Sequence, residues 1–206
     1  MRDMFAPCAL GLCVTVLFAP IVFAEEVTLT SEHMTYLYES RAKIPAPDYK
    51  LAEMISVEYR GAQDEFTKRD LFKKIKPVLD ERLAQGRTTT EVVIHVSTTI
   101  GEYDFDKQAF PTGFNESTYL PFENDYAAIF TNVQDSVYLA TPEDKARNYA
   151  ALLRQGRRGE IVIKASVVGV EEKKFDMFVS RKVLKLRIKE FKLIHDSGKE
   201  FGSKIL

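Results

Sequence analysis

Two stretches near the C-terminus decide the fold class: Gly159-Glu-Ile-Val-Ile-Lys-Ala-Ser-Val-Val168 and Lys182-Val-Leu-Lys-Leu-Arg-Ile-Lys-Glu-Phe-Lys-Leu-Ile194. In the second stretch aliphatic residues alternate with cations, Leu184, Leu186 and Ile188 with Lys185, Arg187 and Lys189. This period of two is typical of a β-strand with one buried side and one solvent-facing side. We therefore predict strands over residues 160–170 and 183–194, the second with a cationic outer face.

Further segments extend the predicted sheet. Strands are expected at 91–100, 175–179 and 199–205, and residues 126–132 and 136–140 are expected to form a hairpin. In the strand over 183–194 the alternation shifts by one residue between Ile188 and Phe191, which predicts a β-bulge at Lys189 and Glu190.

The N-terminal part has helical rather than strand periodicity. Helices are predicted over 28–42, from Asp48 to Gly61, and from a capping box at Thr67 and Asp70 to Gly86. Pro77 lies inside the third and is expected to kink or divide it. A further helix is predicted over 142–155, where Thr141-Pro-Glu-Asp supplies an N-cap, a proline at the first helical position and acidic residues in the first turn.

Because helices and strands are segregated along the chain, we predict an α+β fold. N-terminal helices precede a mostly antiparallel β-sheet, into which the helix over 142–155 is inserted. Residues 25–206 are expected to form a single domain, with a helical part at 25–88 and a sheet part at 89–206.

The first 24 residues resemble a secretory signal peptide. A short charged start is followed by an apolar run over 10–23, and Val22-Phe-Ala24 supplies small residues before a cleavage site. We expect the mature chain to begin at Glu25 and to reach the periplasm or the exterior; a retained membrane anchor is the alternative. Both cysteines, Cys8 and Cys13, lie in this segment, so the mature chain has neither disulfide nor thiol, which favours a bacterial periplasm.

An acidic series follows the strand over 91–100. If the chain stays extended, Glu102, Asp104 and Asp106 place three carboxylates on one face. Carboxylates suit hard cations, but alternate positions about 7 Å apart do not converge on one ion, so no metal site is predicted. The alternative is pairing with the basic row Lys185, Arg187 and Lys189, if the two strands are neighbours.

Residues 107–125 lack regular periodicity and are rich in aromatic side chains, among them Phe110, Phe114, Tyr119 and Phe122. A loop of this length is usually functional, or is packed by its own side chains. We therefore weigh a binding surface formed by Phe114, Tyr119 and Phe122 against a loop that covers the sheet.

The basic face formed by Lys185, Arg187 and Lys189 could meet an anionic polymer or membrane surface, or could be solvated. Nucleic acid is not expected as a partner of an exported chain. No catalytic residue or cofactor is predicted. His195, Asp196 and Ser197 are neighbours in a turn, and adjacent residues cannot align as a catalytic triad.

Two short motifs carry a family resemblance. Asp64-Glu-Phe66 before a helix, and Glu102-Tyr-Asp-Phe105 followed by Phe110, resemble an uncharacterised family of secreted bacterial proteins, a domain of unknown function. The resemblance implies an exported α+β domain and brings no activity with it.

These observations favour a non-catalytic periplasmic binding or interaction module, whose partner would be another envelope protein or an anionic surface. Two alternatives stay open. One is a hydrolase that uses the acidic strand and the aromatic loop, and the other is a protein of anionic membrane surfaces.

Overall fold

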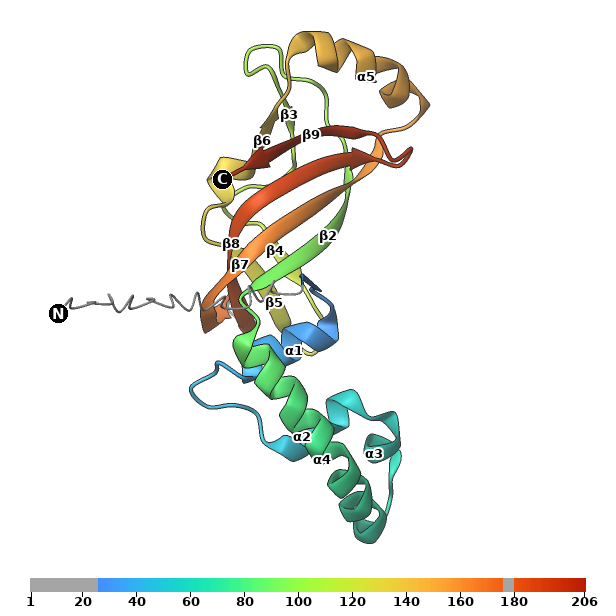
Figure 1. The fold of residues 1–206 in the computed structure, drawn as a ribbon, viewed down its shortest axis with the longest axis vertical. Helices are drawn as coiled ribbons and strands as arrows, with labels where there is room; N and C mark the ends of the chain where they lie inside the picture. Colours follow the sequence, from blue (N-terminus) through green and yellow to red (C-terminus); the bar gives the residue numbers. More distant parts are fainter. Residues whose placement is uncertain (1–25, 176–179) are drawn as a thin grey trace, which may run out of the picture.

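The computed structural model describes residues 26–175 and 180–206. The predicted signal peptide and most of the predicted strand over 175–179 lie outside these residues. The chain folds into a helical arm, formed by the first four helices, and a curved sheet with a fifth helix at its far end (Figure 1). The α+β prediction is therefore confirmed, with helices first and a mostly antiparallel sheet after them.

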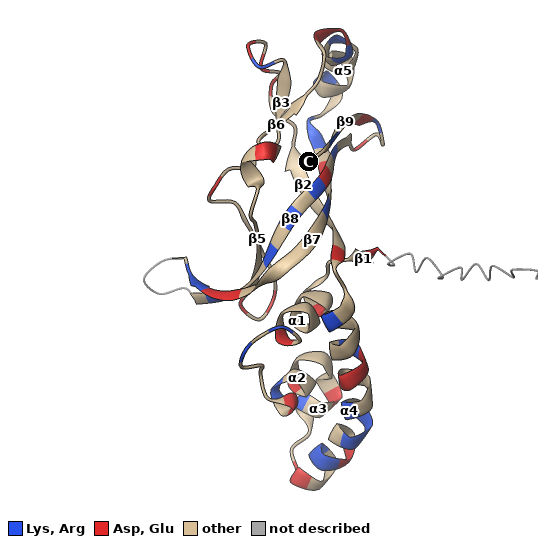
Figure 2. Cartoon of the chain, turned by 60° about the vertical axis from the view of Figure 1, so that its left-hand side comes forward, with Lys and Arg blue, Asp and Glu red and all other residues tan. Residues whose placement is uncertain are grey.

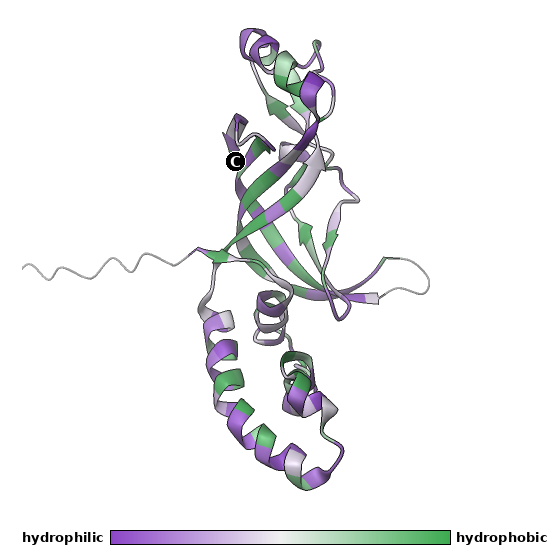
Figure 3. Cartoon of the chain, turned by 90° about the vertical axis from the view of Figure 1, so that its right-hand side faces the viewer, coloured by the Kyte–Doolittle hydropathy of each residue, from purple (hydrophilic) through white to green (hydrophobic). Residues whose placement is uncertain are grey.

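The arm consists of α1 (Ser31–Glu39), α2 (Asp48–Ile55), α3 (Val57–Gly61) and α4 (Glu65–Thr88). Figure 3 shows α4 spanning the whole length of the arm, with the shorter helices beside it. Pro77 lies inside α4, which is not divided there. Contacts with the other three arm helices hold α4 along its length, which offsets the backbone hydrogen bond that proline cannot make.

Two predicted ends of α4 were wrong. The N-cap lies three residues before the proposed one, because the Asp64 carboxylate accepts a hydrogen bond from the backbone N–H of Thr67 at 2.8 Å, and the helix begins at Glu65. It also continues past Gly86 to Thr88. Gly86 is buried inside the helix rather than ending it, since its missing side chain lets α1 approach.

The main sheet is mixed, with strand order β1-β2-β7-β8-β5-β4, and β9 also pairs with β8. Its strands are β1 (Val27–Thr28), β2 (Glu91–Thr99), β4 (Tyr119–Pro121), β5 (Tyr126–Phe130), β7 (Arg158–Lys174), β8 (Ser180–His195) and β9 (Glu200–Ile205). The pairs β1 with β2 and β5 with β8 are parallel, and the others are antiparallel. A small second sheet pairs β3 (Ala109–Pro111) with β6 (Tyr138–Ala140).

The predicted hairpin of residues 126–132 with 136–140 was wrong. β5 pairs with β4 and β8, whereas β6 pairs with β3. A short 3₁₀-helix, η1 (Val133–Ser136), separates β5 from β6 and replaces a tight turn. The aromatic segment over 107–125, which has no strand pattern in the sequence, supplies β3 and β4 as the partners.

The predicted β-bulge was confirmed. Lys164 of β7 lies opposite Glu190, and Ala165 lies opposite Ile188, so Lys189 is the extra residue of β8. Ile188 is buried before the bulge and Phe191 after it, so the inward face changes from even to odd positions.

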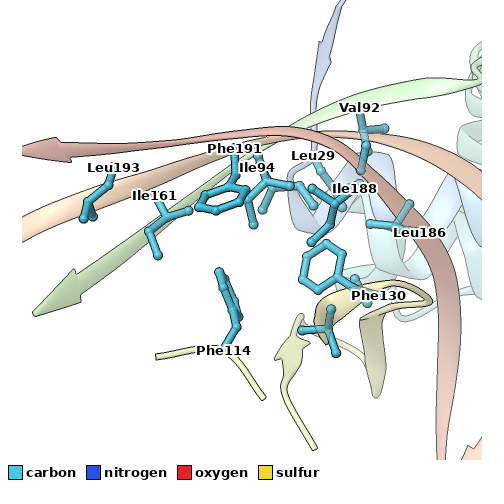
Figure 4. Close-up of a cluster of buried hydrophobic side chains, with 14 of the residues drawn as sticks. Leu29, Val92, Ile94, Phe114, Phe130, Ile161, Leu186, Ile188, Phe191 and Leu193 are labelled. Carbon is cyan, nitrogen blue, oxygen red and sulfur yellow. The ribbon is translucent and has the colours of Figure 1, made fainter. Parts of the chain in front are cut away.

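The principal hydrophobic core fills the concave side of the sheet. Figure 4 shows Phe191, Ile188, Leu186 and Ile94 of the sheet facing Phe114 and Phe130. The inserted helix α5 (Glu143–Gln155) adds Ala146 to this core. The arm has two smaller cores of three buried residues each, Tyr36 with Leu51 and Leu79, and Ala52 with Tyr59 and Leu71.

Candidate functional site

A groove of about 850 Å³ lies where α1 and α4 meet the start of the sheet. We call it the α1–α4 groove. Fourteen residues line it: Val27, Glu32, His33, Tyr36, Leu37, Val78, Glu81, Arg82, Gln85, Gly86, Thr88, Thr89, Thr90 and Glu91. A volume of this size is in the range of small-molecule and peptide sites.

An ion pair crosses the groove between the two helices. Glu32 of α1 contacts the guanidinium of Arg82 on α4, and Arg82 also lies over the ring of Tyr36, 5.6 Å from its centre. The Tyr36 hydroxyl donates to Glu32 at 3.4 Å. Because Tyr36 is buried, its pKa is raised from 10.0 to about 12, so its hydroxyl stays a donor well into the alkaline range.

Polar and apolar groups share the rest of the lining. Glu81 and Gln85 lie one turn apart on α4, and the Gln85 amide donates a hydrogen bond to the Glu81 carboxylate at 3.3 Å. Leu37 is buried and Val78 is 45% exposed, so an apolar surface faces the groove beside these polar groups. Such a lining can bind a ligand that has an aliphatic part together with a cationic or hydrogen-bonding group.

Close approach of the two helices shapes the groove. A Cβ at Gly86 would lie 2.7 Å from the backbone oxygen of Tyr36, so only glycine fits where the helices meet. The guanidinium of Arg41, just after α1, donates to the backbone oxygens of Gly86 and Thr89 at the end of α4. It also donates to the oxygen of Arg87 at 3.2 Å, so one cation binds the helix C-terminus where the dipole is negative.

The predicted acidic face does not form. Asp104 and Ala109 bridge a turn, and the Asp104 carboxylate accepts from the backbone N–H and the ammonium of Lys107, both at 3.0 Å. The backbone N–H of Lys107 is the main cause of the lowered pKa of Asp104. Glu102 and Asp106 are exposed, and Glu102 faces Arg157 at 3.5 Å. The three carboxylates therefore do not share one flat strand face.

The predicted pairing of this series with the basic face was also wrong, because β7 lies between β2 and β8. Lys185 instead pairs with Glu171 at 3.0 Å, and Lys189 pairs with Glu91. Arg187 is exposed on β8. Figure 2 shows basic segments along β8, and two of its three cations have carboxylate partners on β7 and β2, so much of the basic face is neutralised within the sheet.

The aromatic segment packs onto the sheet. Phe114 is buried in the core 5.9 Å from the Phe130 ring, and Phe122 packs against the same core. Tyr119 is 38% exposed, its ring centre lies 4.6 Å from that of Phe175 with the two rings tilted by 41°, and the guanidinium of Arg181 is 5.9 Å from its ring. Of the three proposed binding residues, Tyr119 is the most accessible.

A buried charge network was not anticipated from the sequence. The Glu39 side chain, at the end of α1, is fully buried and accepts from the Tyr126 hydroxyl, the Lys182 ammonium and the backbone N–H of Ala46, each at 2.6 Å. Glu39 has the sequence context of an ordinary helix surface residue. Only the approach of β5 and β8, distant in sequence, makes it a buried polar contact between arm and sheet, beside the apolar contacts of Met34, Leu37 and Tyr38.

Other polar groups are engaged in structure. His195 is buried, with Nε2 3.0 Å from the Gly156 oxygen and Nδ1 2.9 Å from the Ser197 hydroxyl.

Residues 26–175 and 180–206 contain no group of three or more His, Cys, Asp or Glu side chains that could hold a metal ion. In the same two ranges no helix is long and apolar enough to cross a membrane.

Comparison with known proteins gives one match. Neither the curated proteins nor the solved structures include one that matches the chain. Residues 53–151, from the end of α2 into α5, match the family model described as Domain of unknown function (DUF4852). Both resembling motifs fall within this range, and the resemblance to an uncharacterised family is thereby confirmed.

Proposed function

We propose that this chain is an exported, non-catalytic binding module and that the α1–α4 groove is its binding site. The observation that carries the proposal is the groove itself, with its size and its mixed lining of carboxylates, an aromatic hydroxyl and aliphatic side chains. Its charged groups interact with one another, as Glu32 does with Arg82, which suits recognition better than proton transfer.

The charge of the lining favours a cationic ligand. Of its three carboxylates, Glu32 pairs with Arg82 and Glu91 pairs with Lys189, whereas Glu81 has no ion-pair partner among the described residues. Opposite charges on ligand and site steer association and select partners. A basic segment of another envelope protein, with an aliphatic side chain against Val78, is the ligand class that these groups fit best.

Export is part of the proposal, and the mass of the purified protein tests it. A chain produced in a bacterial host should be found in the periplasmic fraction with Glu25 as its first residue. A cytoplasmic protein that retains residues 1–24 would contradict export while leaving the groove untouched.

Site-specific crosslinking tests the groove. A photoreactive amino acid at Gln85, inside the groove, should give a crosslinked adduct with an envelope protein, and Glu81→Lys should abolish it by repelling a cationic partner. The same photoreactive residue at Lys74, an exposed position of α4 outside the groove, is the matched control. Adducts of equal yield at both positions, or adducts that survive Glu81→Lys, would contradict the proposal.

The two alternative functions have less support. A hydrolase would need the acidic series to converge, whereas Asp104 is bound by Lys107 in a turn. An anionic membrane surface would need free cations on β8, whereas Lys185 and Lys189 already have carboxylate partners. Joint substitution of Asp104 and Asp106, and sedimentation with anionic vesicles, test these two alternatives respectively.

A further inference from the structure

The outer edge of β2 is open over half of its length. β1 pairs only with Val92 and Val93, and the strand continues to Thr99. Three backbone hydrogen bonds fix which residues point outward: Leu29 N–H donates to Val93, whereas Val167 donates to Thr90 and Ile100 donates to Arg157 on the β7 side. Odd-numbered residues of β2 therefore point their N–H and C=O groups away from β7.

His95, Ser97 and Thr99 continue this odd series beyond β1. All three residues are exposed, and within the described chain their outward backbone groups have no hydrogen-bonding partner. Unpaired N–H and C=O groups in a row form a template on which another strand can add.

The other edges of the sheet have protective features. β4 has three residues and ends in Pro121, and β1 has two residues. β9 carries Glu200 and Lys204, has a register shift opposite Leu193 and Ile194, and lies beside β6. Short length, proline, charge and bulges are the usual means by which proteins block edge pairing. The segment from Ile94 to Thr99, which we call the open edge, has none of them: it is regular, contains no lysine, arginine, aspartate or glutamate, and is rich in β-branched residues.

We propose that a second copy of this chain pairs with the open edge, forming an antiparallel two-fold dimer centred on Ser97. In this register His95 of one copy lies opposite Thr99 of the other, and Ser97 lies opposite itself. The two-fold axis makes the His95–Thr99 pair occur twice, so there are three pairs, and each exchanges two backbone hydrogen bonds, about six in all, which satisfies every outward group of the open edge.

The charges beside the open edge allow this pairing. Glu160 lies opposite Ser97 on β7, and its carboxylate is 3.1 Å from His95 Nδ1. In the dimer the two Glu160 residues are separated by three strand spacings, about 14 Å, which exceeds the screening length of about 8 Å at physiological ionic strength. A symmetric contact of one surface with itself is the commonest way in which soluble chains form dimers.

A thiol placed at the two-fold axis tests the geometry. Both cysteines of the full chain, Cys8 and Cys13, are replaced by serine, and Ser97→Cys then gives one thiol per chain. Directly opposed residues of this kind have Cα atoms about 5.5 Å apart, which a disulfide can bridge. Mild oxidation should link Ser97→Cys into a dimer, whereas Ser203→Cys, on an exposed position of β9, should stay monomeric on a non-reducing gel.

Sedimentation across a range of concentrations provides the second measurement. The unmodified chain should dimerise reversibly, and Ser97→Pro and Ser97→Lys should each raise the dimer dissociation constant about tenfold or more, because one removes an outward N–H and the other adds charge. Ser203→Lys is the matched control and should leave the dimer intact. Circular dichroism establishes that each variant is folded.

A chain that is monomeric at every soluble concentration overturns the proposal, and so does a dimer that Ser97→Pro and Ser97→Lys leave unchanged. Binding of an extended peptide to a monomer through the same edge would also overturn it, since the occupant would then be a different molecule.

Discussion

Glu39 adds a buried charge network to the contact between the arm and the sheet, where Met34, Leu37 and Tyr38 of α1 also join the principal core. Its buried carboxylate accepts hydrogen bonds from Tyr126, Lys182 and the backbone of Ala46. Burial and the neighbouring carboxylate raise the pKa of Tyr126 far above that of a free tyrosine, so its hydroxyl remains a donor. Lys182 also lies 5.2 Å from the Tyr126 ring centre, which adds a cation–π contact.

Replacement of Glu39 by alanine should therefore be costly. Glu39→Ala leaves the Lys182 ammonium and the Tyr126 hydroxyl without their acceptor, and losing one member of a buried ion pair costs about 3 kcal/mol. Urea unfolding measures the change. Glu102→Ala, which removes a carboxylate whose side chain is 89% exposed, should leave the unfolding free energy unchanged. An equal loss in both variants would show that Glu39 has no special role.

The raised pKa of Tyr36 predicts that folding stability falls at alkaline pH. Its pKa is raised from 10.0 to about 12 by burial, so the folded state favours the protonated hydroxyl. The resulting stabilisation is fully present below pH 10.0 and is lost as the pH rises towards about 12. Tyr36→Phe keeps the ring and lacks the ionisable group. The stability of the unmodified chain should fall relative to this variant above pH 10 and run parallel to it below; parallel curves throughout would contradict the assignment.

At the scale of elements, the crossing of α1 and α4 depends on Gly86. Alanine is normally the better helix residue, by about 1 kcal/mol. Here a Cβ would meet the Tyr36 backbone, which cannot rotate away as a side chain can. Gly86→Ala should therefore lower the unfolding free energy by about 1–3 kcal/mol. Gly61→Ala, whose Cβ would meet nothing within 4 Å, is the control and should be neutral or stabilising in thermal unfolding.

The sequence predicts elements well where one local pattern determines them. The alternation over 183–194 predicted both β8 and its bulge, and the sequence Thr141-Pro-Glu-Asp predicted the start of α5. The sequence does not predict an element whose formation depends on a strand distant in the chain. β3 and β4 lack strand periodicity and exist because β6 and β5 offer pairing edges.

The candidate site could not be predicted for the same reason. Glu32, Arg82 and Glu91 each have the sequence pattern of a solvent-facing position, and the groove exists only once α1, α4 and β2 are packed. The acidic and basic rows were visible in the sequence, but strand order was not, and strand order determined their partners.

At the scale of the whole molecule, the arm and the sheet have hydrophobic cores of different size, so the arm should unfold locally at lower free energy than the sheet. The sheet has one extensive core, whereas each of the two arm cores has three buried residues. Regions with few buried apolar contacts open at lower free energy. Native-state hydrogen exchange should therefore show faster exchange of amides in α2 and α3 than in β7 and β8. Uniform protection of both parts would indicate a single cooperative unit.

The extra residue at Lys189 is what lets an inner face of even positions continue as an inner face of odd positions. Deleting Lys189 would make Ile188 and Glu190 neighbours, so Ile188, Glu190 and Phe191 would point inward, outward and inward without a bulge. The partners of Glu190 and Ile188 on β7 would also stay the same. The bulge is thus a position where β8 can lose one residue while Phe191 and Leu193 remain in the core, and relatives that lack it should keep the same inner face.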